Sequence, residues 1–450
     1  MALDSIGANW RHNYQRSIYY FEGAVGSVSS ANVFRHDGRI FTFILNNGIY
    51  YPQADISDRL TGSSATGWMY VSAETEEIEL YDTDGRLLSI RSRAGRTHTL
   101  HYDSDGRLQS VSDDFGQSIA FTYSLPAGDL NGVQRIVAMA DTAGNAYQYG
   151  FGANATLTSV TYPDSTIKQY QYAGPTARAL TGIVDESGGT YATYAYDAYG
   201  QATLSAHAAG AEQVSIIYTK TGDLQLGPAY VTDSLGATRT YQYGFVLGVP
   251  KILSITQPGS SGSGTASQIF SYDLNGNTIG KTDFAGNLTC YAYDLSRNLE
   301  TVRIEGFAST VSNCPTNLAS YTPAVGTRER KFTTFWNGSF RLPSTITEPN
   351  RITSFTYDAN GNQHTKILTD TTVTPNVSRT WAYTYDGYGR MLTALGPRTD
   401  VLDKTTYAYY TCTTGYQCGQ VQTLTNVLGQ VTTFLTYNAH GQPLTITASP

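Results

Sequence analysis

The chain has 450 residues, more than a single hydrophobic core usually organises, so we expect several domains or one repeat array. Charged residues make up only 14%, whereas there are 44 glycines and 35 tyrosines, a composition that favours strands and tight turns over helices. The net charge of −7 comes without a basic cluster, which argues against nucleic acid or an anionic membrane as the main partner. No apolar run approaches the roughly 20 residues of a membrane span.

The first 75 residues are rich in aromatic and strand-forming residues, with turn signals in the strings RHDGR and LNNG. They lack the rhythm of the rest of the chain, so we expect residues 1–75 to form a separate β leader element. The opening string MALDSIGANWRHNYQ has neither the basic region nor the apolar stretch of a conventional signal peptide. We therefore expect export without a leader sequence, or an N-terminus that is not the natural one.

A repeated motif follows from about residue 76. The string YDTDGRL, which starts at Tyr81, returns as YDSDGRL at Tyr102, 21 residues later, and aromatic–x–aromatic pairs continue along the chain at spacings of mostly 21–29 residues. A catalytic site needs its residues once, whereas a scaffold needs them in every unit. The repetition therefore indicates a structural role, and we expect one repeat region over residues 76–450.

Each unit predicts two strands and two turns. In GQSIAFTY (116–123) large apolar residues alternate with small or polar ones, which is typical of a strand with one buried face. In the Tyr-Asp-x-x-Gly turn that follows, we expect Asp to accept hydrogen bonds from backbone amides two or three residues on, and Gly to adopt positive φ. Stacked units would pair into an extended antiparallel sheet. The predicted signature residues are Tyr81, Asp82, Gly85, Arg86, Tyr102, Asp103, Gly106, Arg107, Tyr293, Asp294, Tyr357, Asp358, Gly361, Tyr385, Asp386 and Gly389.

Two segments and four cysteines depart from this rhythm. Residues 257–268 are expected to form a flexible loop, and residues 306–330 a long loop or an insertion. Cys412 and Cys418 bracket a glycine-containing loop and can bridge a hairpin, whereas Cys290 and Cys314 lie about one period apart and can face each other on neighbouring strands. Free thiols or zinc are the alternatives, although no Cys-x2-Cys pair exists. Either disulfide would indicate an oxidising location outside the cytoplasm.

The strings YDTDGRL, YDSDGRL, YAYDLSRNL, YDANGN and YTYDGYGR resemble the YD repeats of bacterial RHS proteins, which also occur in teneurins and in the C components of insecticidal toxin complexes. The resemblance covers roughly residues 76–450, and the strings WRHNYQ and GRIFTF are similar to the segment before the first repeats of large RHS polypeptides. It implies a hollow shell, made of a long spiralling β-sheet, that encloses a C-terminal toxin or effector often used against neighbouring cells. The expected fold is all-β, an open segment of such a spiral; a β-propeller is the alternative, because two units would make one blade.

The end of the chain departs from this family pattern. The core segment that follows the repeats in the family, with a DPxGxxxGxNxYxYxxNNP-like motif, has no match, and the chain stops at PLTITASP inside the repeat rhythm. We expect a fragment or a degenerate copy of a shell that carries no toxin domain. Its terminal strand, at about residues 432–437, would then be unpaired on one side.

No stretch of the sequence predicts chemistry. GNTIGKT (276–282) has one residue too few between its glycines for a phosphate-binding loop. The pairs Asp82/Asp84 and Asp103/Asp105 look like calcium-loop openings, but the chain enters strand sequence where further ligands are needed. The seven histidines are scattered. We assign no catalytic, cofactor-binding or metal-binding residues and expect no enzyme.

The leading interpretation is a non-catalytic structural protein, secreted or at the cell surface. Its expected partner is an encapsulated effector supplied by the rest of a longer polypeptide. The alternative is a cell-surface module that binds carbohydrate or protein, because tyrosine-rich β-surfaces suit stacking on sugars. Neither interpretation involves nucleic acid, a cofactor or a membrane span.

Overall fold

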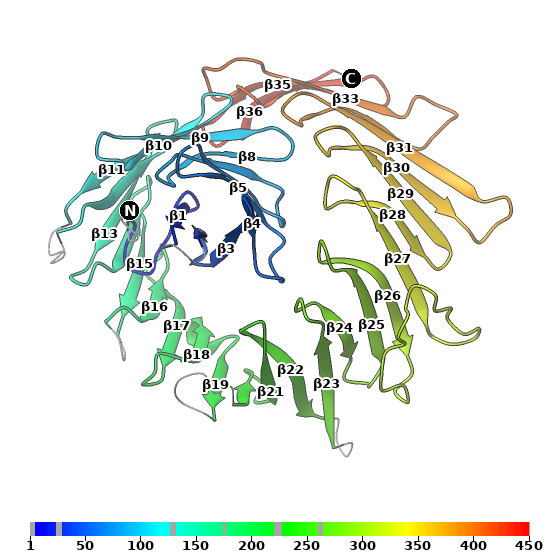
Figure 1. The fold of residues 1–450 in the computed structure, drawn as a ribbon. Helices are drawn as coiled ribbons and strands as arrows, with labels where there is room; N and C mark the ends of the chain where they lie inside the picture. The colour runs from blue at the N-terminus through cyan, green and yellow to red at the C-terminus, as the bar shows by residue number, and fades with distance from the viewer. Residues whose placement is uncertain are drawn as a thin grey trace. The chain divides into compact units, whose positions relative to one another are not determined.

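The computed structural model describes residues 5–23, 29–126, 132–173, 177–219, 227–259 and 264–449. These residues form β-strands, β1 to β36, joined by turns, and their one helical element is a short 3-10 turn at Ala208–Gly210 (Figure 1). No helix in the described part of the chain has the length and apolarity needed to cross a membrane. The central part of the predicted loop 257–268 lies outside the described residues.

Strands β1 to β4 form a small antiparallel sheet of their own, in chain order. One face of this sheet carries Ala31, Val33 and Phe43, which are fully buried. The ring of Phe43 packs edge-to-face on Tyr70, outside the sheet. The bounds are β1 Ser17–Phe21, β2 Ser30–Phe34, β3 Ile40–Asn46 and β4 Ile49–Tyr51.

Strands β5 to β36 form one long sheet, in which strands that are consecutive in the chain lie next to each other. A β-propeller would interrupt the pairing after each blade of four strands, so this order favours the long sheet over the propeller. The prediction of an all-β fold built on a long antiparallel sheet is confirmed. The bounds are β5 Arg59–Ser63, β6 Gly67–Val71, β7 Ile78–Tyr81, β8 Leu87–Arg91, β9 Thr97–Tyr102, β10 Leu108–Asp113, β11 Ser118–Ser124, β12 Arg135–Ala140, β13 Ala146–Phe151, β14 Leu157–Thr161, β15 Ile167–Tyr172, β16 Leu180–Val184, β17 Thr190–Tyr196, β18 Ala202–His207, β19 Val214–Tyr218, β20 Ala229–Thr232, β21 Thr238–Val246, β22 Val249–Pro258, β23 Thr265–Tyr272, β24 Thr278–Thr282, β25 Leu288–Asp294, β26 Leu299–Phe307, β27 Arg330–Trp336, β28 Pro343–Glu348, β29 Arg351–Tyr357, β30 Gln363–Asp370, β31 Val377–Tyr385, β32 Met391–Leu395, β33 Lys404–Tyr409, β34 Val421–Thr425, β35 Val431–Tyr437 and β36 Pro443–Ala448.

Two boundaries differ from the sequence-based expectation. The leader expected over residues 1–75 is divided, because β1 to β4 form the small sheet whereas β5 and β6 join the long one. The prediction that residues 432–437 form a free terminal strand is wrong. These residues lie in β35, which pairs with β34 on one side and with β36 on the other. Residues 443–448 supply one more hairpin strand than the aromatic rhythm indicated.

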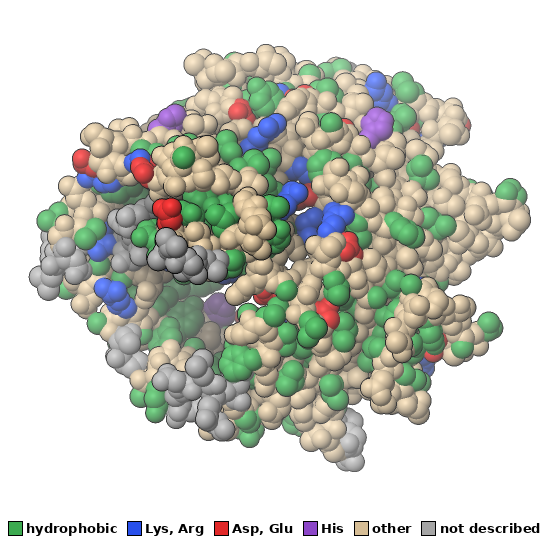
Figure 2. All heavy atoms as spheres, in the orientation of Figure 1, with side chains coloured by type: hydrophobic (Ala, Val, Ile, Leu, Met, Phe, Trp, Pro, Cys, Tyr) green, Lys and Arg blue, Asp and Glu red, His purple; other side chains and the backbone are tan. Residues whose placement is uncertain are grey.

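The low proportion of charged residues in the sequence is also seen on the surface. On the face drawn in Figure 2, Lys, Arg, Asp and Glu side chains are sparse and hydrophobic side chains interrupt the polar surface in many places. Single exposed apolar residues are normal on proteins, but six of them gather on the solvent-exposed face of β1, β3 and β4. They are Tyr19, Phe21, Ile40, Ile44, Ile49 and Tyr51, each at least 42% exposed.

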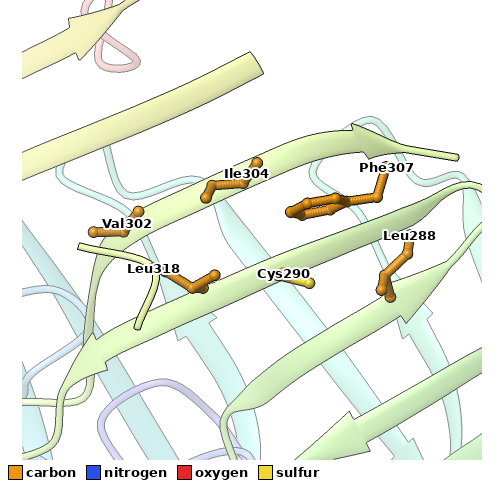
Figure 3. Close-up of a cluster of buried hydrophobic side chains, with 6 residues drawn as sticks. All are labelled: Leu288, Cys290, Val302, Ile304, Phe307 and Leu318. Atoms are coloured by element: carbon orange, nitrogen blue, oxygen red, sulfur yellow. The ribbon is translucent and has the colours of Figure 1, made fainter. Parts of the chain in front are cut away.

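The chain folds into two compact units, of which the first comprises residues 1–13, 121–139 and 145–331. Its N-terminal segment lies on β13 to β15: the Ala8 amide donates to the Ala155 carbonyl at 2.7 Å, and Trp10 Nε1 donates to the Tyr172 hydroxyl at 2.8 Å. A buried cluster lies between β25, β26 and the loop that follows (Figure 3). This loop falls in the predicted 306–330 segment, and its Leu318 is only 5% exposed. The cluster comprises Leu288, Cys290, Val302, Ile304, Phe307 and Leu318.

The second unit comprises residues 14–120, 140–144 and 332–450. Segments far apart in the sequence meet in it. The backbone amide of Arg341 donates to Glu76 Oε1 at 2.6 Å, and the Phe115 and Tyr388 rings lie with centroids 4.9 Å apart. In Figure 1 the region of β9 and β10 accordingly lies alongside that of β33 to β36. The early and late strands of this unit are therefore held together through their turns.

Candidate functional site

The repeated Tyr-Asp turn is built around its aspartate. Asp82 Oδ1 accepts the backbone amides of Asp84 at 3.0 Å and Arg86 at 2.8 Å, while its Oδ2 accepts Arg86 Nε at 2.9 Å. Asp103 repeats this pattern with Asp105 and Arg107. The expectation that Asp binds amides two or three residues on is therefore wrong in its second part, because the bonded amides lie two and four residues on. The amide of Gly85, three residues on, instead donates to the backbone carbonyl of Asp82 at 3.1 Å.

The turn varies at its fourth position after Asp. Arg390 Nε donates to Asp386 Oδ2 at 2.7 Å, as in the repeats at Asp82 and Asp103. At Asp358 the donor is instead Asn362 Nδ2, at 2.9 Å. The unit at Asp294 has no glycine. There the positive φ of 50° falls on Asn298, and Asp294 Oδ1 accepts the amide of Ser296 at 3.0 Å.

The glycines of the turn adopt the predicted conformation. Gly85, Gly106 and Gly361 have φ of 77°, 74° and 75°, and Gly389 has 72°. At Gly85 a second requirement applies, because β1 crosses the turn. The Ile18 amide donates to the Gly85 carbonyl at 2.9 Å, and a Cβ atom on Gly85 would lie 1.9 Å from the Ile18 carbonyl oxygen.

A tyrosine that ends a strand just before the turn ties most of the repeats to the preceding strand pair. Its hydroxyl donates a hydrogen bond of 2.6–3.1 Å to a backbone carbonyl 14–20 residues earlier. Burial also raises the pKa of Tyr293, Tyr357 and Tyr385 above the ordinary value. Sequence reasoning assigned these tyrosines to the scaffold but missed the acceptor. The donor–acceptor pairs are Tyr102–Leu87, Tyr172–Leu157, Tyr196–Leu180, Tyr218–Ala202, Tyr272–Ile252, Tyr293–Thr278, Tyr357–Pro343, Tyr409–Met391 and Tyr437–Val421.

Tyr81 departs from this rule, because its hydroxyl donates to the carboxylate of Glu79. Glu79 is fully buried in β7 and accepts two hydrogen bonds from Arg35, at 2.6 and 2.8 Å, as well as one from Arg16. Burial by itself would raise the pKa of Glu79, but the hydrogen bonds and charges of Arg35 and Arg16 outweigh it, and the pKa lies below its ordinary value. This buried ion-pair cluster joins the small sheet to the long one.

Sequence reasoning missed the Glu79 cluster, although β7 carries a signal for it. Alternation along Ile78–Tyr81 places Glu79 on the same face as Tyr81, whereas Leu80 is 44% exposed. A carboxylate at an inward position needs a cationic partner. The sequence does not reveal that the partners are Arg16 and Arg35.

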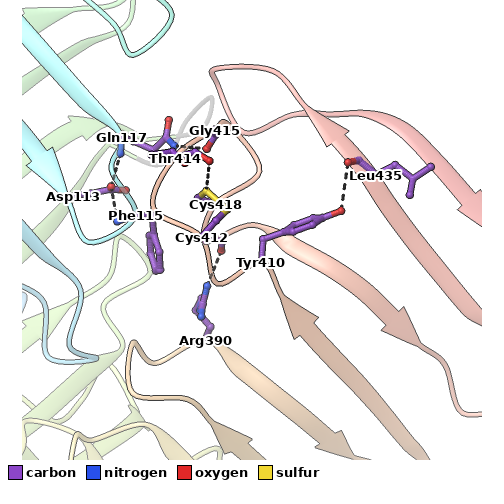
Figure 4. The surroundings of a disulfide bond; sticks show 11 residues. Asp113, Phe115, Gln117, Arg390, Tyr410, Cys412, Thr414, Gly415, Cys418 and Leu435 are labelled. Atoms are coloured by element: carbon purple, nitrogen blue, oxygen red, sulfur yellow. Dashed lines mark hydrogen bonds between the residues drawn. A yellow bond between two sulfur atoms is a disulfide. The ribbon is translucent and has the colours of Figure 1, made fainter.

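The four cysteines are joined as two disulfides in the structure. Cys290 and Cys314, with Cα atoms 5.6 Å apart, cross the base of the core cluster in the first unit. Cys412 and Cys418, with Cα atoms 5.0 Å apart, close a loop in the second unit (Figure 4). Within the described ranges no group of three or more His, Cys, Asp or Glu side chains is arranged to hold a metal ion.

Two hollows in the second unit have volumes of about 300 and 220 Å³. Carboxylates that line them are engaged in turn formation. In the larger hollow, Asp113 Oδ1 accepts the amides of Phe115 and Gln117, and Asp114 Oδ2 accepts the amide of Thr97 at 2.7 Å. In the smaller one, Glu76 Oε2 pairs with Arg93 at 2.6 Å. These arrangements shape turns and connect strands.

Comparison with solved structures finds a similar fold in crystal structures that contain TcdB2 and TccC3. A crystal structure of TcdB2-TccC3-TEV is 12% identical and covers 96% of this chain and 22% of that chain, with a TM-score of 0.50. A TcdB2-TccC3-Cdc42 structure is 13% identical over the same shares, with a TM-score of 0.49. A Photorhabdus luminescens Tc holotoxin pore is 12% identical and covers 96% of this chain and 26% of that chain, with a TM-score of 0.35. The chain thus spans about a fifth of the length of the first of these structures.

Comparison with curated proteins yields no match. The teneurin YD-shell family, in contrast, matches residues 67–339. That range begins at the first residue of β6 and contains the signature turns at Asp82, Asp103 and Asp294. The predicted relation to YD-repeat proteins is confirmed: the chain belongs to the teneurin YD-shell family.

Proposed function

We propose that this chain forms part of the wall of a β-shell that encloses or displays an effector polypeptide used in competition between cells, and that the wall itself carries out no catalysis. The observation that carries the proposal is the serial Tyr-Asp turn. In the repeats that carry Tyr-Asp, the Asp side chain shapes the turn. In most repeats the tyrosine hydroxyl holds the preceding strand pair. The signature residues are thus committed to building a continuous wall.

One further observation supports an extracytoplasmic place for this wall. Both pairs of cysteines lie at bonding distance, and disulfides persist in oxidising compartments. We therefore propose that the protein is secreted or lies at the cell surface, and that its partner is an effector segment of the same polypeptide.

Protection of the effector from protease tests the proposal. The natural polypeptide that carries residues 1–450, at the length that the cell makes, is treated with protease in its native state and after denaturation. We expect any effector segment to resist digestion in the native state and to be cleaved rapidly after denaturation. Equal rates of cleavage in the two states would contradict encapsulation.

A second candidate function is binding of carbohydrate or protein by the solvent-exposed face of β1, β3 and β4. Tyr19 and Phe21 stack edge-to-face there with centroids 4.6 Å apart, and Tyr51 is 50% exposed. A glycan array probed with the wild type and with a Tyr19→Ser/Tyr51→Ser variant separates the two functions. A signal that the variant loses would favour binding; protease protection that the variant retains would show that the wall function does not need this face.

A further inference from the structure

The loop between β33 and β34 is closed twice. At its base, Tyr410 and Gly419 are joined by a backbone hydrogen bond of 3.0 Å, and the Tyr410 amide donates to the Gln420 carbonyl at 3.0 Å. Across its middle, the disulfide joins Cys412 to Cys418 (Figure 4). Within the loop, the Cys418 amide also donates to the Gly415 carbonyl at 3.2 Å. The disulfide is the one covalent constraint on the segment 413–417 and adds to these backbone hydrogen bonds.

This segment holds a turn from the other end of the chain. Gln117 Nε2 donates to the Gly415 carbonyl at 3.1 Å, across 298 residues of sequence. The turn 113–117 and the loop are in close backbone contact as well. A Cβ atom on Gly116 would lie 2.1 Å from the Thr413 carbonyl oxygen, so the two backbones meet with no room for a side chain.

Arg390 forms the floor of the same contact and is only 6% exposed. Its Nη1 donates to the Gly419 carbonyl at 3.1 Å, and its guanidinium carbon lies 4.8 Å from the centroid of the Phe115 ring. A Cβ atom on Gly419 would lie 2.5 Å from that ring. Phe115 is thus seated between the Arg390 guanidinium and the end of the disulfide loop, so the fit depends on the path of the loop backbone.

We propose that the Cys412–Cys418 disulfide is a redox-operated clasp that holds the turn 113–117 against the loop 410–420. When oxidised, it fixes Thr413 and Gly415 where they contact Gly116 and Gln117. When reduced, it leaves the loop held by its backbone hydrogen bonds alone and releases the turn. The proposal concerns the cohesion of the second unit and does not depend on the effector-enclosing function proposed above.

The reaction requires a dithiol reductant, either a small molecule or a protein. Cys412 is partly exposed, whereas Cys418 is 1% exposed, so the reductant thiolate attacks the Cys412 sulfur and the S–S bond breaks with Cys418 as the leaving thiolate. The second thiol of the reductant then resolves the mixed disulfide. Two electrons and two protons pass to the protein, which gains two thiols, while the reductant becomes a disulfide. The Cys418 sulfur lies 3.1 Å from the Thr414 carbonyl oxygen, which can accept a hydrogen bond from the new thiol.

The effect of reduction should be local. Cys412 and Cys418 are 6 residues apart, and a cross-link that closes so short a loop constrains the unfolded chain less than one that closes a long loop. Reduction therefore loosens the contact with residues 113–117 without unfolding the unit. This distinguishes a clasp from a disulfide that merely supports global stability.

Hydrogen–deuterium exchange on the full chain, before and after treatment with dithiothreitol, tests the clasp. We expect peptides that cover 113–120 and 410–420 to exchange on the order of tenfold faster after reduction, and to slow again after reoxidation. In a Cys412→Ser/Cys418→Ser variant, both peptides should exchange fast before treatment, and dithiothreitol should not change their rates. The matched control, Cys290→Ser/Cys314→Ser, removes the disulfide of the first unit and should keep the response of the wild type.

Two results would overturn the proposal. If reduction speeds exchange at 410–420 but leaves 113–120 unchanged, the disulfide shapes only its own loop. If exchange rises throughout the second unit, in the wild type and in Cys290→Ser/Cys314→Ser alike, the Cys412–Cys418 disulfide supports the stability of the whole unit and not one contact. In the Cys290→Ser/Cys314→Ser variant only Cys412–Cys418 is left to reduce, so this variant gives both readings even if the Cys412→Ser/Cys418→Ser variant fails to fold.

Discussion

The hydroxyl of Tyr102 donates a 2.6 Å hydrogen bond to the backbone carbonyl of Leu87, 15 residues earlier in the chain. Leu87 begins β8 and Tyr102 ends β9, so the bond spans the junction between two successive Tyr-Asp turns. The same bond joins Tyr172 to Leu157 in the first unit at 2.7 Å. In both repeats the tyrosine at the end of the strand thus acts as a donor that fixes one repeat to the one before it.

Removing one such hydroxyl group should lower the free energy of unfolding measurably, although only one oxygen atom is lost. In Tyr102→Phe the ring still packs, but the Leu87 carbonyl loses its donor, so we expect a loss of about 1 kcal/mol in the free energy of unfolding. Tyr199→Phe, at a turn tip where the side chain is 63% exposed, is the control and should change little. Denaturant unfolding of the three proteins measures this. Equal midpoints for wild type and Tyr102→Phe would show that the bond adds nothing to stability.

The features that the sequence predicts well are local ones. The positive φ of Gly85 follows from its place three residues after Asp82, and the strands follow from alternation of apolar residues over a few positions. The bonding of Asp82 to the amide four residues on was mispredicted because the Gly85 amide is already used by the backbone of the turn. Within a single turn, therefore, sequence reasoning fails only in detail.

The features that sequence reasoning misses depend on partners far along the chain. Glu79 finds Arg35 across 44 residues, and Gln117 finds Gly415 across 298 residues. Neither pairing leaves a periodic trace, since each partner is a common residue in an ordinary context. They arise only once the strands are stacked, which fixes which turns meet.

Glycines of the turns should differ in their tolerance of a side chain. Gly236→Ala introduces a Cβ atom at φ of 81° with nothing within 4 Å, so we expect backbone strain alone, about 1 kcal/mol. Gly85→Ala adds a collision with the Ile18 carbonyl, a backbone atom that cannot turn aside, and we expect about 3 kcal/mol. Thermal unfolding of both variants gives the comparison. A Gly85 variant no less stable than the Gly236 variant would show that β1 does not rest on this turn.

The oxidation state of the cysteines remains a prediction. In protein taken from an oxidising compartment, we expect non-reducing peptide mapping to find Cys290 joined to Cys314 and Cys412 joined to Cys418. Alkylation before digestion provides the control, because it labels only free thiols. Four alkylated cysteines would remove the argument from disulfides for a location outside the cytoplasm.

The Glu79 cluster predicts that the protein loses stability at acid pH. The pKa of Glu79 in the folded protein lies below its ordinary value of 4.5, because the hydrogen bonds and charges of Arg35 and Arg16 outweigh the effect of burial. A depressed carboxyl pKa stabilises the fold above the pKa of the unfolded chain, and this contribution is lost as pH falls through the folded pKa. The stabilisation should therefore be complete at neutral pH and decline below about pH 4.5.

Glu79→Gln tests this directly, because it keeps the shape of the side chain and removes its charge. At neutral pH the variant leaves Arg35 buried without a counter-charge, so we expect a loss of about 3–5 kcal/mol in the free energy of unfolding. The difference from wild type should shrink as pH falls through the folded pKa, since the wild type then loses the same charge. Glu77→Gln is the matched control: Glu77 is 31% exposed and lies 3.5 Å from Arg16, so its loss should cost less than about 1 kcal/mol. A pH-independent difference between wild type and Glu79→Gln would mean that the carboxylate packs as a neutral group and that Arg35 draws its stability from elsewhere.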